Sequence, residues 1–252
     1  IKDKDLINKI TADGLNAVIP EGESKGYTVL WFLTTKSCGR QLFFDDELRD
    51  KISVKGLNSV VLEGRCKGTS ALLMLAGSIE GQQLLNDDKD LRGKITVGGL
   101  NAVVDQGEDI GRSALYFFTS STKGRQLLIN DEVLRAKITA DGLNAVIHEG
   151  EDKGVSVLWV LAGSIEGQQL LKDDAGLKSN ITDIGLNTVK AEGRYKGVSV
   201  LFMLARVAQG QQLLEDDKLR GKITTEALNA VVANGESALL GLAGNPEGRQ
   251  LL

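Results

Sequence analysis

The dipeptide Leu-Asn recurs six times along the chain, and this recurrence constrains the fold more than any other feature of the sequence. Successive copies are separated by 42 or 43 residues. A fixed period of this length is typical of tandem repeats, in which each copy is one supersecondary unit that stacks on the next. The leucines that set the register are Leu15, Leu57, Leu100, Leu143, Leu186 and Leu228.

Two further blocks recur in register with Leu-Asn. The first is apolar, as in Val157-Leu158-Trp159, and the second has the pattern Gly-x-Gln-Leu, as in Gly167-Gln168-Gln169-Leu170. In the sixth copy the apolar block comes four residues early, which predicts a shortened loop before it. The third residues of the apolar blocks, which we call the aromatic stripe, are Trp31, Leu73, Tyr116, Trp159, Phe202 and Leu240.

Apolar residues within each copy recur at spacings of three and four, which predicts helices and argues against strands. In the fourth copy, we expect Thr139 to cap the N-terminus of a first helix over 139–149. A second helix over 154–163 is apolar nearly all round, as a buried helix is, and a third, short helix over 167–174 precedes a bend around Leu177. The prediction is an all-α fold with three helices per copy. Such a unit must stack on its neighbours to bury its apolar face.

These blocks resemble the armadillo family, whose close relatives are the HEAT repeats. The stretch from Leu158 to Leu171 is similar to the family's third helix followed by a short first helix, and Gly-Leu-Asn-Ala-Val is similar to its second helix. The resemblance implies one repeat domain over residues 1–252, a right-handed α-solenoid of about six armadillo-like three-helix repeats. Asn stands in all six copies where the family's second helix has Pro.

The same resemblance implies that the aromatic stripe, and the residue four positions later, line the concave face of the solenoid. The family often carries Asn at that later position, where it holds the backbone of an extended peptide, but this chain has none there. Two interpretations of the stripe stay open, a partner-binding groove or core packed between copies. Arg206 also has two interpretations: it anchors a carboxylate, or it is an ordinary surface group. The candidate binding residues are Trp31, Thr35, Leu73, Tyr116, Ser120, Trp159, Phe202 and Arg206.

Two polar rows accompany the apolar blocks. Asn is a poor residue inside a helix, so its recurrence after each leucine predicts a specific role. We expect its amide to satisfy a loop or a neighbouring helix end, with ligand contact as the alternative. The row of second Gln residues, from Gln41 to Gln250, has the same two interpretations, and the structural one is favoured. The members of the Asn ladder are Asn16, Asn58, Asn101, Asn144, Asn187 and Asn229.

Charge and composition argue against several classes of function. The net charge is −4, whereas a nucleic-acid binder needs a basic stripe, so nucleic acid is an unlikely partner. The single histidine, His148, has no counterpart in other copies, and no catalytic motif accompanies it, so no enzyme, cofactor or metal is predicted.

Paired acids such as Asp87-Asp88 lack the loop that brings several calcium ligands together, so they predict a solvated, partly ion-paired edge. No membrane span is predicted. Cys38 and Cys66 suit a reducing compartment such as the cytoplasm.

The leading hypothesis for function is a non-catalytic scaffold that binds a protein or an extended peptide along the concave face. The alternative is a structural spacer that self-associates through its open ends, and a nucleic-acid-binding repeat ranks third. Both ends of the chain fall inside a copy of the repeat. This predicts that the chain is a piece of a longer array, or that its ends associate with another copy.

Overall fold

The computed structural model describes residues 4–22, 24–64, 66–107, 109–150, 152–190 and 195–252. Within these residues the chain forms 24 α-helices and one 3-10 helix and has no β-strand, only isolated bridges. The all-α prediction is therefore confirmed. The chain divides into two compact units, Ile1–Ile138 and Thr139–Leu252, and each is described by itself.

The helices are short throughout. The first unit contains α1 (Lys4–Lys9), α2 (Ala12–Asn16), α3 (Val29–Thr35), α4 (Ser37–Arg40), η1 (Gln41–Phe44), α5 (Asp46–Asp50), α6 (Val54–Asn58), α7 (Ala71–Ala76), α8 (Ile79–Asp87), α9 (Lys89–Gly93), α10 (Val97–Asn101), α11 (Ala114–Ser120), α12 (Thr122–Asn130) and α13 (Glu132–Arg135). The second contains α14 (Ala140–Asn144), α15 (Val157–Ala162), α16 (Ile165–Asp173), α17 (Ala175–Asn180), α18 (Asp183–Asn187), α19 (Val200–Ala205), α20 (Ala208–Leu214), α21 (Asp217–Arg220), α22 (Thr225–Asn229), α23 (Ala238–Ala243) and α24 (Pro246–Arg249).

The fourth copy of the sequence repeat forms four helices, α14 to α17, so the prediction of three is wrong. The segment around Leu177, predicted as a bend, is α17. The first helix ends at Asn144 and does not reach residue 149, because Ala145 leaves the helical conformation (φ −55°, ψ 127°) and the chain then pairs back through a bridge between Val146 and Ser156. A turn with a left-handed Gly150 separates the two bridged residues.

Side-chain caps explain where these helices begin. Thr139 caps α14 by accepting a hydrogen bond from the Gly142 N–H at 3.0 Å, as the sequence predicts. Ser or Thr caps the second helix of each copy in the same way, and Asp caps the fourth in the five copies that have one. The first-helix caps are Thr11, Ser53, Thr96, Thr139, Thr182 and Thr224. The fourth-helix caps are Asp45, Asp88, Asp131, Asp174 and Asp216.

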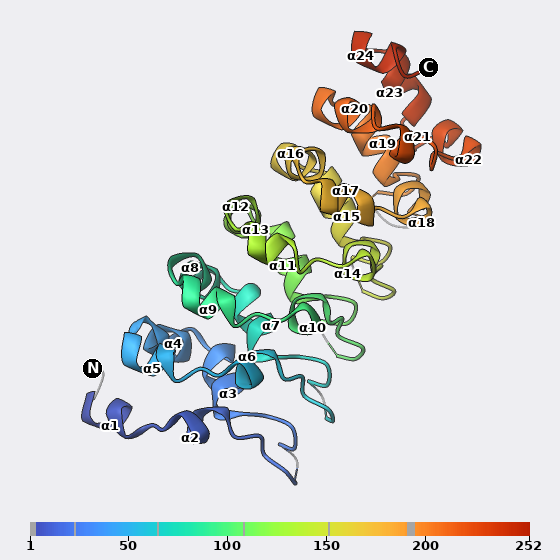
Figure 1. The fold of residues 1–252 in the computed structure, drawn as a ribbon. Coiled ribbons are helices and arrows are strands. Elements are labelled where there is room, and N and C mark those ends of the chain that lie inside the picture. The colour runs from blue at the N-terminus through green and yellow to red at the C-terminus, as the bar shows by residue number, and fades with distance from the viewer. Residues whose placement is uncertain (1–3, 23, 65, 108, 151, 191–194) are drawn as a thin grey trace. The chain divides into compact units, whose positions relative to one another are not determined.

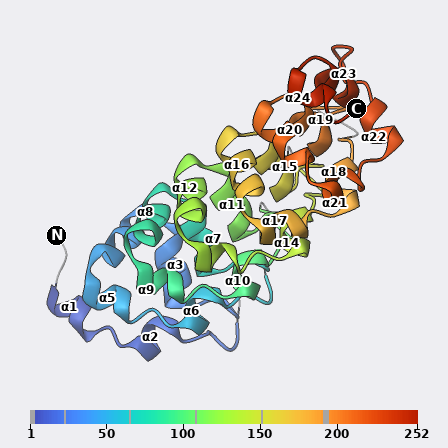
Figure 2. The same cartoon turned by 45° about the horizontal axis from the view of Figure 1, so that its top comes forward.

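In the first unit, equivalent helices of successive copies contact one another in three columns. The columns are α2, α6 and α10; α3, α7 and α11; and α4, α8 and α12 (Figure 1). The middle column supplies much of the core, including Leu30, Leu72 and Leu115, each with 0% of its surface exposed. In the second unit, α15, α19 and α23 form the corresponding buried column, which Figure 2 shows from another side. The helices therefore bury their apolar faces against equivalent helices of the next copy.

Ion pairs join the fourth helices of neighbouring copies. Arg92 Nε lies 2.7 Å from Asp131 Oδ2, and both side chains are about 85% buried. Burial opposes ionisation of Asp131, but the hydrogen bond from the Leu134 N–H and the ion pair with Arg92 outweigh it and hold its pKa below the ordinary value. The pKa of Asp88, which pairs with Arg49, is lowered for the same reasons. In three of the acidic positions predicted as a solvated edge, at Asp88, Asp131 and Asp216, one carboxylate thus lies between two copies.

We expect these carboxylates to make stability depend on acid pH. A carboxyl group whose pKa is lower in the folded state contributes stability above its unfolded pKa, near 3.9, and loses it as the pH falls through the folded value. Melting temperatures measured across a pH series should fall below about pH 4. The variant Asp131→Asn should melt earlier than the wild type at neutral pH, and the difference should shrink in acid. A difference that stays constant with pH would show that the pair contributes no linked stability.

Candidate functional site

The Asn ladder joins the first helix of one copy to the start of the next. Asn58, the last residue of α6, donates from Nδ2 to the Lys94 carbonyl at 2.8 Å, and its Oδ1 accepts from the Thr96 N–H at 2.9 Å. Nδ2 also donates to the Val54 carbonyl inside its own helix. Equivalent bridges to the next copy are made by Asn16, Asn144 and Asn187. These amides occupy their hydrogen-bonding groups within the chain, which leaves them little capacity for a ligand.

The sequence predicts a structural role for the second Gln of each Gly-x-Gln-Leu block. In the structure, the residue just before that Gln performs it. Gln82 donates from Nε2 to the Ala76 carbonyl at 2.7 Å and so satisfies the end of α7. The side chains that donate to the equivalent carbonyl in other copies are Arg40, Arg125, Gln168, Gln211 and Arg249. Gln83, a member of the predicted row, is half-buried and instead bonds the Asp87 carboxylate one turn along the helix surface.

The aromatic stripe is partly core. Trp31, Leu73 and Phe202 are 8%, 2% and 5% exposed, so these three side chains offer almost no surface to a partner. For these three residues the burial favours the second interpretation, core packed between copies. Tyr116 and Trp159 are half-buried.

The two tryptophans differ in their hydrogen bonding. Trp31 Nε1 donates to Thr69 Oγ1 of the next copy at 3.0 Å, and its ring makes an edge contact with Tyr27 at 4.5 Å between centroids. Trp159 Nε1 is buried and has no acceptor among the described residues. The later positions of the predicted groove bond to their own helices, since Thr35 Oγ1 donates to the Phe32 carbonyl and Ser120 Oγ to the Tyr116 carbonyl.

A different row of side chains is partly open to solvent. One residue after the stripe, Phe32 is 46% exposed, and its counterparts Met74, Phe117, Val160 and Met203 are half-buried. We call these five residues the Phe/Met row. A neighbour one residue along a helix is turned by about 100°, which moves it from the packed face toward solvent. The signal was present in the sequence, because the chain has only two methionines and both belong to this row.

Glycines make room beside the row. A Cβ atom on Gly77 would stand 3.6 Å from the Phe117 ring, and one on Gly163 would stand 3.6 Å from Met203 Sδ. Both glycines occupy the position where the armadillo resemblance implies a groove-lining Asn. In place of an amide, this position therefore holds space into which the row side chain of the next copy extends.

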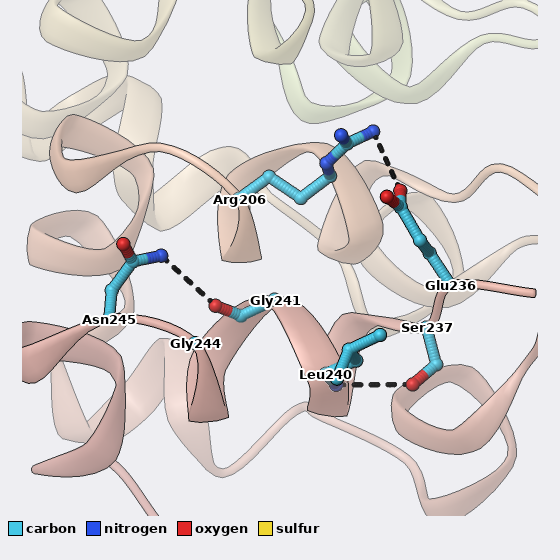
Figure 3. Close-up of a pocket in the computed structure, with 7 residues that line it drawn as sticks. All are labelled: Arg206, Glu236, Ser237, Leu240, Gly241, Gly244 and Asn245. Carbon is cyan, nitrogen blue, oxygen red and sulfur yellow. Dashed lines mark hydrogen bonds and ion pairs between the residues drawn. The ribbon is translucent and has the colours of Figure 1, made fainter.

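The hollow beside Arg206 has a volume of about 180 Å³ and is lined mainly by the last copy of the repeat (Figure 3). Arg206 NH1 lies 3.1 Å from Glu236 Oε2, and its guanidinium lies over the Phe202 ring at 5.2 Å. Gly241, which lines the hollow, stands where the other five copies carry the Phe/Met row, and a Cβ atom there would stand 3.1 Å from the Ala205 carbonyl oxygen. Arg206, considered above as an anchor for a partner's carboxylate, is paired with a carboxylate of its own chain.

Other functional groups are sparse in the part of the chain that the structure describes. It holds no cluster of three His, Cys, Asp or Glu side chains that could bind a metal ion. His148 is exposed, and Cys38 and Cys66 are free thiols. No described helix has the length and apolar character needed to cross a bilayer.

No protein-family model matches this chain, and no curated protein matches its sequence.

Proposed function

We propose that this chain is a non-catalytic scaffold that binds a protein or an extended peptide. In this proposal its copies stack as a right-handed, armadillo-like α-solenoid of about six repeats, and a partner lies along the Phe/Met row. The columns of equivalent helices within each unit support the repeat architecture. The free cysteines suit a reducing compartment such as the cytoplasm.

The Phe/Met row carries the proposal. Single exposed apolar residues are ordinary on a protein surface, but here one helix position is apolar and partly exposed in five successive copies. Phe supplies large contact area, and Met adapts its shape to varied partners, which is why Met-rich surfaces often bind peptides. We therefore expect a partner to contribute apolar side chains that insert between successive row residues.

Selection from a random peptide library displayed on phage, followed by fluorescence anisotropy with labelled peptide, tests this function. The variant Phe32→Ser/Met74→Ser/Phe117→Ser removes the row from the first unit. If that unit contributes the contact, we expect affinity for a selected peptide to fall at least about 100-fold, since a few central apolar residues carry most of the energy of such interfaces. The corresponding double variant, Val160→Ser/Met203→Ser, tests the second unit.

A matched control variant removes exposed apolar side chains that lie outside the row. Val54, Val97 and Val133 are 50%, 48% and 67% exposed and lie outside the row, so their triple Ser variant should bind as the wild type does. Peptides that bind row variants and wild type equally would contradict the proposal. A row variant that instead alters the mass of the particle in sedimentation would favour the structural spacer that associates with its own copies.

A further inference from the structure

Lys190 stands at a position that is apolar in every other copy. It has the backbone pairing of that position, since its N–H donates to the Val198 carbonyl at 3.0 Å and its carbonyl accepts from the Gly197 N–H at 2.8 Å. Only 6% of its surface is exposed. Because the fold accepts an aliphatic residue here five times, a buried lysine needs another reason. The counterparts are Ile19, Val61, Val104, Ile147 and Val232.

Two aromatic rings surround the ammonium group of Lys190. Its aliphatic stem passes Gly154, where a Cβ atom would come within 3.2 Å of Lys190 Cγ. Nζ then lies 5.8 Å from the Trp159 ring centroid and 5.3 Å from that of Tyr195, and the two rings are 5.1 Å apart. Among the described residues, no carboxylate pairs with Nζ and no acceptor bonds to it. Ring contacts offset only part of the cost of burying a charge.

The buried indole N–H of Trp159, whose ring lies beside Lys190, is a hydrogen-bond donor without an acceptor among the described residues. In the first copy, Thr69 supplies the acceptor for Trp31. The position equivalent to Thr69 is here Val198, which has no side-chain acceptor. Buried donors normally find partners, so this indole N–H beside the Lys190 ammonium favours an acceptor that the described residues do not supply.

Lys190 lines two hollows of the second unit. One, of about 230 Å³, is lined by His148 and Lys153 as well as Lys190. The other, of about 330 Å³, is lined by Lys190 and Lys196. Neither set of described lining residues includes a carboxylate. The titratable groups among the described lining residues are His148, Lys153, Lys190 and Lys196, a basic set that favours an anion.

We propose that the second unit binds a carboxylate at Lys190, with one oxygen accepting from Nζ and the other from Trp159 Nε1. The ammonium lies over the ring that carries the indole N–H, so the two donors belong to one cluster of side chains. Two donors suit the two oxygens of a carboxylate better than the three or four of a phosphate. The ligand is either a small free carboxylate or an Asp or Glu side chain of a partner protein. This site is separate from the Phe/Met row, so it can hold even if the row binds nothing.

The indole N–H resonances in a proton–nitrogen NMR spectrum test the site directly. The chain has two tryptophans, so Trp31 serves as an internal control for Trp159. On titration with sodium acetate at constant ionic strength, we expect the Trp159 indole resonance to shift and saturate while that of Trp31 stays still. The variant Lys190→Met should weaken binding at least about tenfold. Lys172→Met, which removes a lysine outside both hollows, should bind acetate as the wild type does.

The variant Lys190→Val separates loss of binding from loss of fold. Because Val occupies this position in three other copies, we expect its melting temperature to equal or exceed that of the wild type while acetate binding is lost. A capped peptide with a single Glu that binds more tightly than acetate would assign the ligand to a partner protein, and equal affinity would assign it to a free carboxylate. The proposal is overturned if acetate leaves the Trp159 resonance unmoved, if Lys190→Met binds acetate normally, or if inorganic phosphate binds more tightly than acetate.

Discussion

Replacing Gly124 by alanine should destabilise the protein by about 4 kcal/mol or more, the range reserved for severe packing or backbone conflicts. Gly124 lies in the first turn of α12, pressed against the end of α11. A Cβ atom there would stand 2.2 Å from the Phe118 carbonyl oxygen and 2.5 Å from Phe118 Cα. The obstacle is backbone, so no side-chain rotation relieves it and the two helices must separate. Equivalent positions, with a Cβ contact of 2.2 or 2.3 Å, are Gly39, Gly81, Gly167, Gly210 and Gly248.

Gly98→Ala is the matched control for this prediction. Gly98 lies in α10 of the same unit, is exposed, and has no atom within 4 Å of an added Cβ. Alanine there should leave stability unchanged or raise it by up to about 1 kcal/mol, because it favours the helix and restricts the unfolded chain. Urea unfolding followed by circular dichroism measures both variants. Equal effects from the two substitutions would mean that α11 and α12 do not pack as described.

Removing one member of the Asn ladder should be the next most damaging change. Asn58→Ala removes the bridge from α6 to the start of α10 and leaves the Lys94 carbonyl and the Thr96 N–H without their partner. Leaving such groups unsatisfied costs about 1–3 kcal/mol each when they are buried. Since this site is only partly buried, we expect a total loss of about 2–4 kcal/mol in the free energy of unfolding.

Asn229 offers a control with the same residue type. Its amide bonds only the Thr225 carbonyl of its own helix among the interactions of the described residues. Asn229→Ala should therefore cost less than about 1 kcal/mol, and the better helix propensity of alanine offsets part of that cost. If both Asn variants lose the same stability in urea unfolding, the ladder does not couple neighbouring copies.

The periodic features of the fold could be predicted from the sequence, because each depends on local chemistry. Thr139 before an apolar pattern indicates a helix start, and the structure has that cap. The end of the same helix could not be predicted, since the apolar pattern continues into Val146 and Ile147. There the backbone turns extended and pairs with Ser156, a contact between residues ten positions apart that helical periodicity does not encode.

The candidate surface was harder to predict than the fold. Periodicity identifies an apolar helix but does not say which side of it faces the next copy. Trp31 and Phe32 are neighbours on the same helix, yet they are 8% and 46% exposed, and only the stacking of copies decides which of them remains open. The sequence likewise could not show that Gln82, and not Gln83, bonds the end of the preceding helix. The two residues are identical in type and differ only in the direction that each faces. The burial of Lys190 likewise appears only once the copies are packed together.

The methionine methyl groups provide the most direct test of the Phe/Met row. Met74 and Met203 are the only methionines in the chain, and one lies in each unit. Selective labelling of their methyl carbons therefore gives two NMR signals, both from the row. When a selected peptide is added, the account predicts that at least one of these signals shifts and saturates at the affinity measured by anisotropy. Saturating peptide that leaves both signals unmoved would contradict it.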